Sequence, residues 1–287
     1  GMLRATAATH AAAPGVRDIV SGHGEIWSTT LFTAYLARRR EGVKLAAPVR
    51  WLDARQCVTV EWGPLGPAVQ WDVSRLKLDG LLADGFDGTL VITGFIASTM
   101  QGVSTTLGRN GSDFSGSIFG ALLEAVEIVI WTDVDGVLSA DPRRVPNAQV
   151  IDSLSYNEAM ELAYFGAKVI HPQTMAPAVG RSIPIYIRNT FNPSARGTLI
   201  CAKPESALLV KGITTIEGIA LLNIEGAGMI GVPGTAHRLF GALREASISV
   251  ILISQGSSEH SICCAIPQEQ AERAEAAVRE AFSRELE

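Results

Sequence analysis

The residues with the most evident chemical capacity form one string, residues 106–113, which reads Thr-Leu-Gly-Arg-Asn-Gly-Ser-Asp. Gly108 and Gly111 permit backbone geometries that other residues rarely adopt, so several amide N–H groups can converge on one charged oxygen. Arg109 carries a planar guanidinium group that suits a carboxylate or a phosphate through two parallel hydrogen bonds. The string therefore predicts an anion-binding loop. A tight turn with a solvated Arg109 is the alternative.

Two apolar segments flank this loop and indicate its place in the fold. Residues 89–96 have the pattern of a buried strand, and residues 112–126 have the pattern of a helix. Ser112 or Asp113 could cap that helix by accepting a hydrogen bond from its first turn. The loop is therefore predicted to join a strand to a helix.

A second polar loop follows a second apolar strand. Residues 128–131 are predicted to form that strand, and Thr132 and Asp133 come directly after it. In an open α/β sheet, ligands bind in the crevice outside the carboxyl ends of the parallel strands. Two strand ends of this kind indicate a doubly wound sheet with one ligand site, and they weaken the tight-turn alternative.

An acidic candidate lies much earlier in the chain. Residues 20–25 are rich in glycine and are predicted to form a turn, followed by an amphipathic helix over residues 27–40. Glu25 would then lie in the first helical turn, where it could complement the helix dipole or accept hydrogen bonds from an ammonium group. His23, between two glycines, is predicted to be a turn residue rather than a base.

Two cations further along the chain are candidates for binding phosphate. Arg143 is one of two adjacent arginines in a proline-bounded loop, and Lys168 lies next to small residues. A compact ammonium group in such surroundings could approach a phosphate closely. A solvated surface position is the ordinary alternative for both side chains.

Local signals also predict helix boundaries in this part of the chain. Ser155 and Glu158 have the spacing of a capping box, which predicts a helix that continues through Tyr164. Pro172 can begin the next helix at its first position, and His171 before it is predicted to be structural.

Length and composition limit the class of protein. The chain has 287 residues, 47% of them hydrophobic, which favours two domains with sizeable cores. A net charge of −5 without blocks of like charge argues against a nucleic-acid surface.

The four cysteines have neither zinc-site nor disulfide-framework spacing, so a cytoplasmic location is expected. The apolar runs are too short to span a membrane. Residues 1–15 are predicted to be disordered or frayed, with a targeting remnant as the alternative.

The C-terminal third has a different pattern of elements. Composition changes at residues 202–206, and residues 219–282 then predict the order strand, helix, strand, strand, helix. This is a ferredoxin-like unit without its last strand, which residues 208–213 or a partner chain could supply. Because an unpaired sheet edge promotes association, dimerisation through this region is expected.

These strings together resemble those of aspartate kinases, and most closely the kinase and ACT portion of bifunctional aspartokinase–homoserine dehydrogenases. The matching strings run in family order across nearly the whole chain, at residues 22–25, 93–96, 107–113, 131–137, 139–143, 164–172 and 197–199. The resemblance implies an amino acid kinase-like αβα sandwich with a mainly parallel sheet at residues 16–205. It also implies a C-terminal ferredoxin-like α+β ACT domain at residues 206–287.

The resemblance implies ATP-dependent phosphorylation of the β-carboxylate of L-aspartate to 4-phospho-L-aspartate, the first step of lysine, threonine and methionine biosynthesis. Glu25 would hold the substrate amino group, Arg109 its carboxylate, and Ser112 would orient groups beside them. Asp113 and Lys168 would act in catalysis. Contacts to the nucleotide are implied for Thr132, Asp133, Arg143 and Lys168. Mg²⁺ would be carried by the ATP phosphates with few protein ligands.

The ACT-like region implies feedback by an amino acid. Gly228 and Gln255 would bind this effector, with threonine expected from the bifunctional resemblance and lysine as the alternative. A homodimer through the ACT domain is expected, without nucleic-acid or membrane partners.

Three features depart from the family pattern. The opening Lys-Phe-Gly-Gly-Thr-Ser loop of the family has no counterpart in residues 1–20, and Leu138 stands where a nucleotide-stacking tyrosine is usual. One ACT-like unit is present where the family has two, and there is no dinucleotide fingerprint of a dehydrogenase. A catalytically silent regulatory protein that binds an amino acid is therefore the alternative function.

Overall fold

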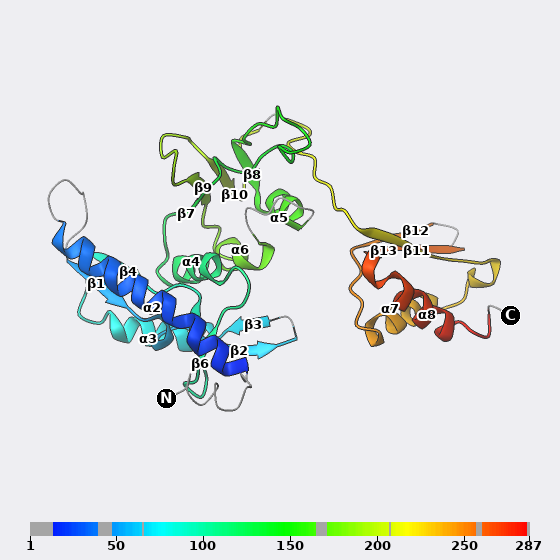
Figure 1. The fold of residues 1–287 in the computed structure, drawn as a ribbon, viewed down its shortest axis with the longest axis horizontal. Coiled ribbons are helices and arrows are strands. Elements are labelled where there is room, and N and C mark those ends of the chain that lie inside the picture. Colours follow the sequence, from blue (N-terminus) through cyan, green and yellow to red (C-terminus); the bar gives the residue numbers. More distant parts are fainter. Residues whose placement is uncertain are drawn as a thin grey trace. The chain divides into compact units, whose positions relative to one another are not determined.

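The computed structural model divides the chain into two compact units, Gly1–Thr214 and Thr215–Glu287 (Figure 1). The structure describes residues 14–39, 48–64, 66–164, 171–206, 208–256 and 260–285. The domain limits predicted from the sequence, 16–205 and 206–287, stay predictions. The prediction of a frayed end at residues 1–15 lies almost wholly outside the described residues.

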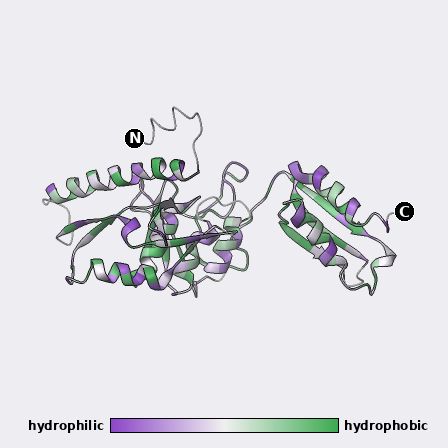
Figure 2. Ribbon diagram, turned by 90° about the horizontal axis from the view of Figure 1, so that it is seen from below, coloured by the Kyte–Doolittle hydropathy of each residue, from purple (hydrophilic) through white to green (hydrophobic). Residues whose placement is uncertain are grey.

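The first unit contains a pair of parallel strands between two helices. β1 (Val49–Leu52) pairs with β4 (Thr89–Ile92) in parallel. The helix α2 (Pro14–Arg38) lies on one side of this pair and α3 (Trp71–Leu81) on the other, as Figure 2 shows from below. This arrangement of helices around parallel strands is the predicted α/β layering.

The helix α2 corrects the predicted turn at residues 20–25. It runs without interruption through Gly22 and Gly24, so His23 lies in a helix rather than in a turn and Glu25 lies far from the first helical turn. Packing explains the difference, because Gly22 is buried against Ile96 and a Cβ there would lie only 2.8 Å from the Ile96 Cγ2 atom. Close packing of the helix thus outweighs the low helix propensity of glycine.

The predicted strand at residues 89–96 is interrupted. β4 ends at Ile92, the chain turns at residues 93–95, and a hairpin follows before the loop at 107–111. The hairpin strands belong to a four-stranded sheet in the order β3-β2-β5-β6. Its strands are β2 (Thr59–Gly63), β3 (Gly66–Val69), β5 (Ile96–Thr99) and β6 (Ser104–Thr106). A one-turn 3₁₀ helix, Ala54–Gln56, connects β1 to β2.

A second four-stranded sheet, in the order β7-β9-β10-β8, contains the other predicted loop. Its β7–β9 and β8–β10 pairs are parallel, whereas β9–β10 is antiparallel. Ile185, Ile187 and Ile200 are fully buried in its core. The strands are β7 (Ile128–Thr132), β8 (Ser153–Ser155), β9 (Ile185–Asn189) and β10 (Thr198–Cys201), with the helices α4 (Gly111–Leu122), α5 (Tyr156–Tyr164) and α6 (Pro172–Val179).

The predicted helix boundaries around α5 and α6 are confirmed. The Ser155 amide donates to the Glu158 carboxylate at 2.7 Å, and the Glu158 amide donates to the Ser155 Oγ atom at 3.2 Å, which forms the capping box. α6 begins at Pro172, and the His171 ring accepts a hydrogen bond from the Gln173 amide as its N-cap. His171 is therefore structural, as predicted.

The second unit has the predicted order of elements. Its three-stranded antiparallel sheet has the order β11-β13-β12, and α7 and α8 cover one of its faces. Both helices alternate between hydrophilic and hydrophobic stretches, as expected for helices with one buried side (Figure 2). The elements are β11 (Ile219–Glu225), α7 (Thr235–Glu245), β12 (Leu252–Gln255), β13 (Ser261–Pro267) and α8 (Ala271–Ala281), with 3₁₀ helices at Ala227–Met229 and Gln268–Gln270.

Residues 208–213 do not supply a fourth strand to this sheet. The Ile213 amide donates to the Ser139 carbonyl, and the Lys211 ammonium group lies 2.8 Å from the Glu158 carboxylate. Both contacts hold the segment against the first unit, which excludes this source of the missing strand. In the part of the chain that the structure describes, no helix combines the length and apolar character needed to cross a membrane.

Gly22 and Gly24 of α2 provide a matched test of its packing. A Cβ at Gly24 would meet no atom within 4 Å, so Gly24→Ala is expected to raise the free energy of unfolding by about 1 kcal/mol through helix propensity. Gly22→Ala is expected to lower it by roughly 1–3 kcal/mol because its methyl group would overlap Ile96. Urea unfolding of both variants checks this, and equal effects at the two positions would contradict the placement of α2.

Candidate active site

Two residues of the loop before α4 have positive φ angles. Gly108 has a φ of +75° and Asn110 a φ of +55°, both in the left-handed region. Gly111 leaves no room for a side chain, because a Cβ there would lie 2.7 Å from the Phe95 Cδ2 atom. The helix N-cap is Asn110, without a side-chain hydrogen bond. The prediction that Ser112 or Asp113 caps the helix is therefore wrong, since both lie inside its first turn.

Glu25 and Ser112 come from distant parts of the sequence and meet beside Gly94. A Cβ placed on Gly94 would lie 3.4 Å from the Glu25 Oε2 atom and 3.6 Å from the Ser112 Oγ atom. The carboxylate, the hydroxyl and the start of α4 therefore border one small space. Because Glu25 lies in the middle of α2, the interpretation that it complements the helix dipole is excluded.

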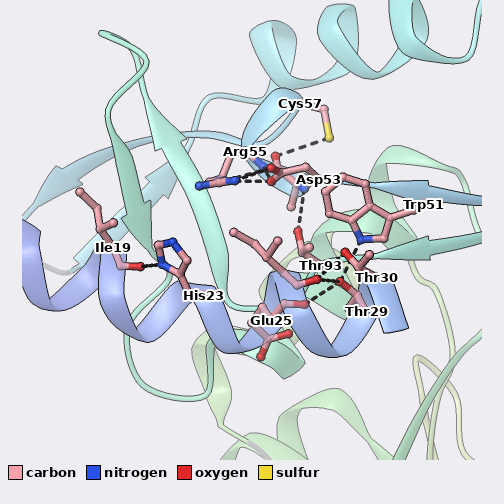
Figure 3. A network of polar contacts seen from close by, with 12 residues as sticks. Ile19, His23, Glu25, Thr29, Thr30, Trp51, Asp53, Arg55, Cys57 and Thr93 are labelled. Atoms are coloured by element: carbon pink, nitrogen blue, oxygen red, sulfur yellow. Dashed lines mark hydrogen bonds and ion pairs between the residues drawn. The ribbon is translucent and has the colours of Figure 1, made fainter. Parts of the chain in front are cut away.

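A hydrogen bond from β1 holds the helix that carries Glu25. The Thr29 hydroxyl donates to the Glu25 carbonyl oxygen at 2.6 Å and accepts a hydrogen bond from the Trp51 indole at 2.9 Å. At the end of β4, the buried Thr93 hydroxyl accepts a hydrogen bond from the Ala54 amide. Figure 3 shows these side chains near Glu25. The sequence does not reveal the roles of Thr29 and Trp51, because residues so far apart along the chain give no signal of contact.

The turn after β4 is strained. Phe95 has a φ of +63°, and the Ile96 amide donates across it to the Gly94 carbonyl at 2.6 Å. A three-residue turn of this hand is rare, and a bulky residue in the left-handed region costs roughly 1–3 kcal/mol. Strain of this kind persists only where surrounding contacts fix the conformation. The turn therefore marks the place where Gly94 is presented to Glu25 and Ser112.

The charges around this space differ in exposure. The Arg109 side chain is exposed at the loop tip, where it is accessible to an anion. Burial raises the pKa of Asp113, which lies one residue after Ser112 in the first turn of α4. A carboxyl group with a raised pKa is typical of sites that handle charged ligands.

The loop after β7 is fixed by side-chain amides from another part of the chain. The Asp135 carboxylate accepts hydrogen bonds from the side-chain amides of Asn189 at 2.7 Å and Asn192 at 3.2 Å. The Thr132 hydroxyl donates to the Asp133 carboxylate at 3.1 Å, so both residues lie on this anchored loop. The roles of the two asparagines are not predicted from the sequence, where the polar residues at the end of β9 and after it are the only signal.

The structure describes only one of the two other residues that are predicted to bind phosphate. Arg143 forms a two-point ion pair with Asp141 at the surface, and its hydrogen bonds lower the pKa of Asp141 to about 2. Arg143 is thus oriented, although its side chain remains largely exposed. Lys168 lies outside the described residues.

The predicted effector residues lie at one end of the sheet in the second unit. Gln255 ends β12 and pairs with Ile262, which also pairs with Ile224 near the end of β11. The loop that carries Gly228 begins directly after β11, so it starts at the same end of the sheet as Gln255.

Comparisons with known sequences divide the chain in two. The profile of the amino acid kinase family matches residues 3–189. The profile of an ACT domain matches residues 222–282.

Relatives and solved structures agree with this division. The chain is 45% identical over 294 residues to the chloroplastic bifunctional aspartokinase/homoserine dehydrogenase 2 of Arabidopsis thaliana, a match that covers 99% of the chain but only 31% of that protein. E. coli aspartokinase III in complex with lysine and aspartate has a TM-score of 0.69 and 31% identity, covering 94% of this chain and 61% of the other. The same enzyme with aspartate and ADP has a TM-score of 0.64 and 26% identity, covering 98% and 78%. The predicted resemblance and fold class are confirmed.

The raised pKa of Asp113 predicts how this residue affects stability. Folding favours the protonated form of such a group, so its ionised form destabilises the fold once the pH exceeds its folded pKa. Asp113→Asn is therefore expected to raise the melting temperature at pH 7 by about 1–3 °C, and the gain should disappear below about pH 3, where the carboxyl group is protonated. Thermal melts from pH 3 to 7 measure this.

The exposed Asp79 on α3 provides the control for this measurement. Asp79→Asn is expected to leave the melting temperature within about 1 °C of the wild type, as is usual for surface substitutions. A lower melting temperature for Asp113→Asn at pH 7 would show that contacts of the ionised carboxylate outweigh its burial.

Proposed function

The chain belongs to the amino acid kinase family and carries an ACT domain, and on this premise we propose that it is an aspartate kinase. It transfers the γ-phosphoryl group of ATP to the β-carboxylate of L-aspartate and forms 4-phospho-L-aspartate. The observation that carries the proposal is the meeting of Glu25 and Ser112 beside Gly94, at the start of the helix that follows Arg109. This space offers complementary groups to both charges of an amino acid.

The chemistry of these side chains assigns them separate parts in binding aspartate. The Glu25 carboxylate accepts hydrogen bonds from the substrate ammonium group, and the Arg109 guanidinium binds a substrate carboxylate with two hydrogen bonds. Ser112 and the N-terminus of α4 add donors that face an anion. Asp113, one residue further on, orients the reacting groups. The substrate is thereby held through its ammonium group and one carboxylate, which leaves its β-carboxylate directed toward the nucleotide.

Phosphoryl transfer to a carboxylate requires little from general acid–base catalysis. The attacking oxygen is already a nucleophile, so the protein mainly positions the two substrates and stabilises the charge of the transferred group. We assign the nucleotide to the loop after β7, with Thr132, Asp133 and Arg143, because Asp135 and its two asparagines hold that loop in place. Lys168 would supply positive charge at the phosphates.

In this assignment Mg²⁺ is bound mainly by the ATP phosphates. Within the described ranges, no group of three or more His, Cys, Asp or Glu side chains is placed to hold a metal ion. Mg²⁺ keeps several waters and binds readily to nucleotide phosphates with one or two protein carboxylates. Asp133, which directly follows β7 and is already assigned to the nucleotide, is the carboxylate that we assign to such a contact.

Regulation would come from the second unit. We assign effector binding to the end of the sheet that carries Gly228 and Gln255, with threonine as the expected effector and lysine as the alternative. The open edge of β11 is the surface through which a homodimer would form. The chain covers less than a third of the length of its Arabidopsis relative. We propose a cytoplasmic location for it.

Removal of the Arg109 guanidinium tests the binding assignment. Arg109→Ala is expected to weaken L-aspartate binding by at least about 100-fold, because a charge-assisted two-point contact is lost. The melting temperature should stay within about 1 °C of the wild type, since the side chain is exposed. Calorimetric titration measures the first quantity, and the exposed Arg181→Ala provides the matched control. A large loss of stability in Arg109→Ala would identify Arg109 as structural instead.

Turnover tests the reaction itself. ADP release from MgATP is expected to depend on L-aspartate and to fall by at least about 100-fold in Asp113→Ala, the scale seen when a group that orients the reaction is removed. Absence of turnover together with retained binding of threonine or lysine would instead support the silent regulatory function.

A further inference from the structure

The strained turn at Gly94–Ile96 is fixed by contacts from outside the turn. The hydrogen bond from the Ile96 amide to the Gly94 carbonyl closes the turn but does not offset the unfavourable φ of Phe95. The Phe95 carbonyl accepts a hydrogen bond from the Leu107 amide at 2.7 Å. The Phe95 ring lies against Gly111, where no side chain would fit. The chain on either side of the substrate loop therefore holds this turn.

Ser115 supplies the remaining contact. Its hydroxyl is buried in α4, with the residue 5% exposed, and accepts a hydrogen bond from the Phe95 amide at 2.8 Å. The same hydroxyl donates to the Gly111 carbonyl at 2.8 Å, one helical turn earlier. A serine that bonds only to the preceding turn of its own helix is common. The hydrogen bond that the Ser115 hydroxyl accepts from the Phe95 amide connects α4 to the strained turn.

This contact bears on substrate binding through Gly94. Gly94 precedes Phe95 and lies next to both the Glu25 carboxylate and the Ser112 hydroxyl. Without the Ser115 acceptor, the Phe95 amide loses its partner in a partly buried place, and the turn can relax toward negative φ. Such a relaxation would rotate the Gly94–Phe95 peptide into or away from the space between Glu25 and Ser112.

We propose that Ser115 is a positioning residue for the amino-acid substrate, acting through the Gly94–Phe95 peptide rather than by touching the substrate. The inference rests on the proposed function, because it assigns Ser115 to the space that would hold L-aspartate. It also extends that function, since it makes substrate affinity depend on a buried hydroxyl one helical turn below the binding surface. The nucleotide loop has no part in this contact, so ATP binding should be independent of it.

A matched pair of serines in α4 tests the proposal. Ser117 lies on the same helix and is 1% exposed, and within the described residues its hydroxyl has no hydrogen-bond partner. Ser115→Ala is expected to weaken L-aspartate binding about tenfold in calorimetric titration of the whole chain, while MgATP binding stays within about twofold. Ser117→Ala should leave both affinities within about twofold of the wild type.

Amide hydrogen exchange gives a readout that does not depend on substrate. Exchange at Phe95 is expected to become at least about tenfold faster in Ser115→Ala and to stay unchanged in Ser117→Ala. Ser115→Cys keeps nearly the same volume with a weaker acceptor, and it serves as the second variant if the alanine does not fold. Its expected loss of aspartate affinity is smaller but in the same direction.

The outcomes separate this inference from the proposed function. Unchanged aspartate affinity in Ser115→Ala and Ser115→Cys, in a wild type that binds aspartate, overturns the inference alone. Equal losses in Ser115→Ala and Ser117→Ala also overturn it, because they indicate general loosening of the helix. A wild-type chain that binds no aspartate under conditions where the Phe95 amide is protected overturns the proposed function, and the inference falls with it.

Discussion

A three-residue turn with a positive φ at its centre joins the elements on which the candidate site depends. Phe95 cannot adopt this conformation without cost, so contacts from the loop at Leu107 and from α4 must hold it. Gly22 lets α2 approach the strand that begins at Ile96, and Gly111 lets α4 approach the turn itself. Three segments that are far apart in the sequence are therefore fixed relative to one another around Gly94.

Different interactions hold the two loops of the site. Close packing and strain position the loop before α4, where Gly111 leaves no room for a side chain. Side-chain amides position the loop after β7, where Asp135 accepts hydrogen bonds from Asn189 and Asn192. Both arrangements fix donors and charges before a ligand arrives. Preorganised groups of this kind stabilise developing charge without the cost of reorganisation during the reaction.

The last residues of the first unit contact α5 and the segment that follows β7. Lys211 pairs with Glu158, and although burial alone would raise the pKa of Glu158, the hydrogen bonds from Lys211 and Ser155 lower it. The Ile213 amide donates a hydrogen bond to the Ser139 carbonyl, and Ser139 lies a few residues after β7. The second unit keeps an open edge at β11, where this strand and α8 line a groove of about 490 Å³. Ferredoxin-like sheets place a further strand at such an edge.

The sequence by itself determined the features that depend on neighbouring residues. The capping box at Ser155, the helix start at Pro172 and the order of elements after residue 219 are local signals, and the structure confirms them. The resemblance to aspartate kinases was likewise readable from strings in family order. Each of these signals lies within a few residues, or follows the spacing of one element.

Only the tertiary structure decided the features that depend on distant contacts. The glycines at 22 and 24 predict a turn from local propensity, but burial against Ile96 makes that segment helical. The apolar run at 89–96 reads as one strand, yet contacts from Leu107 and Ser115 turn it at Phe95. The asparagine partners of Asp135 lie more than fifty residues away. Packing free energy of this kind exceeds the small differences in local propensity, and it becomes available only when the chain has folded.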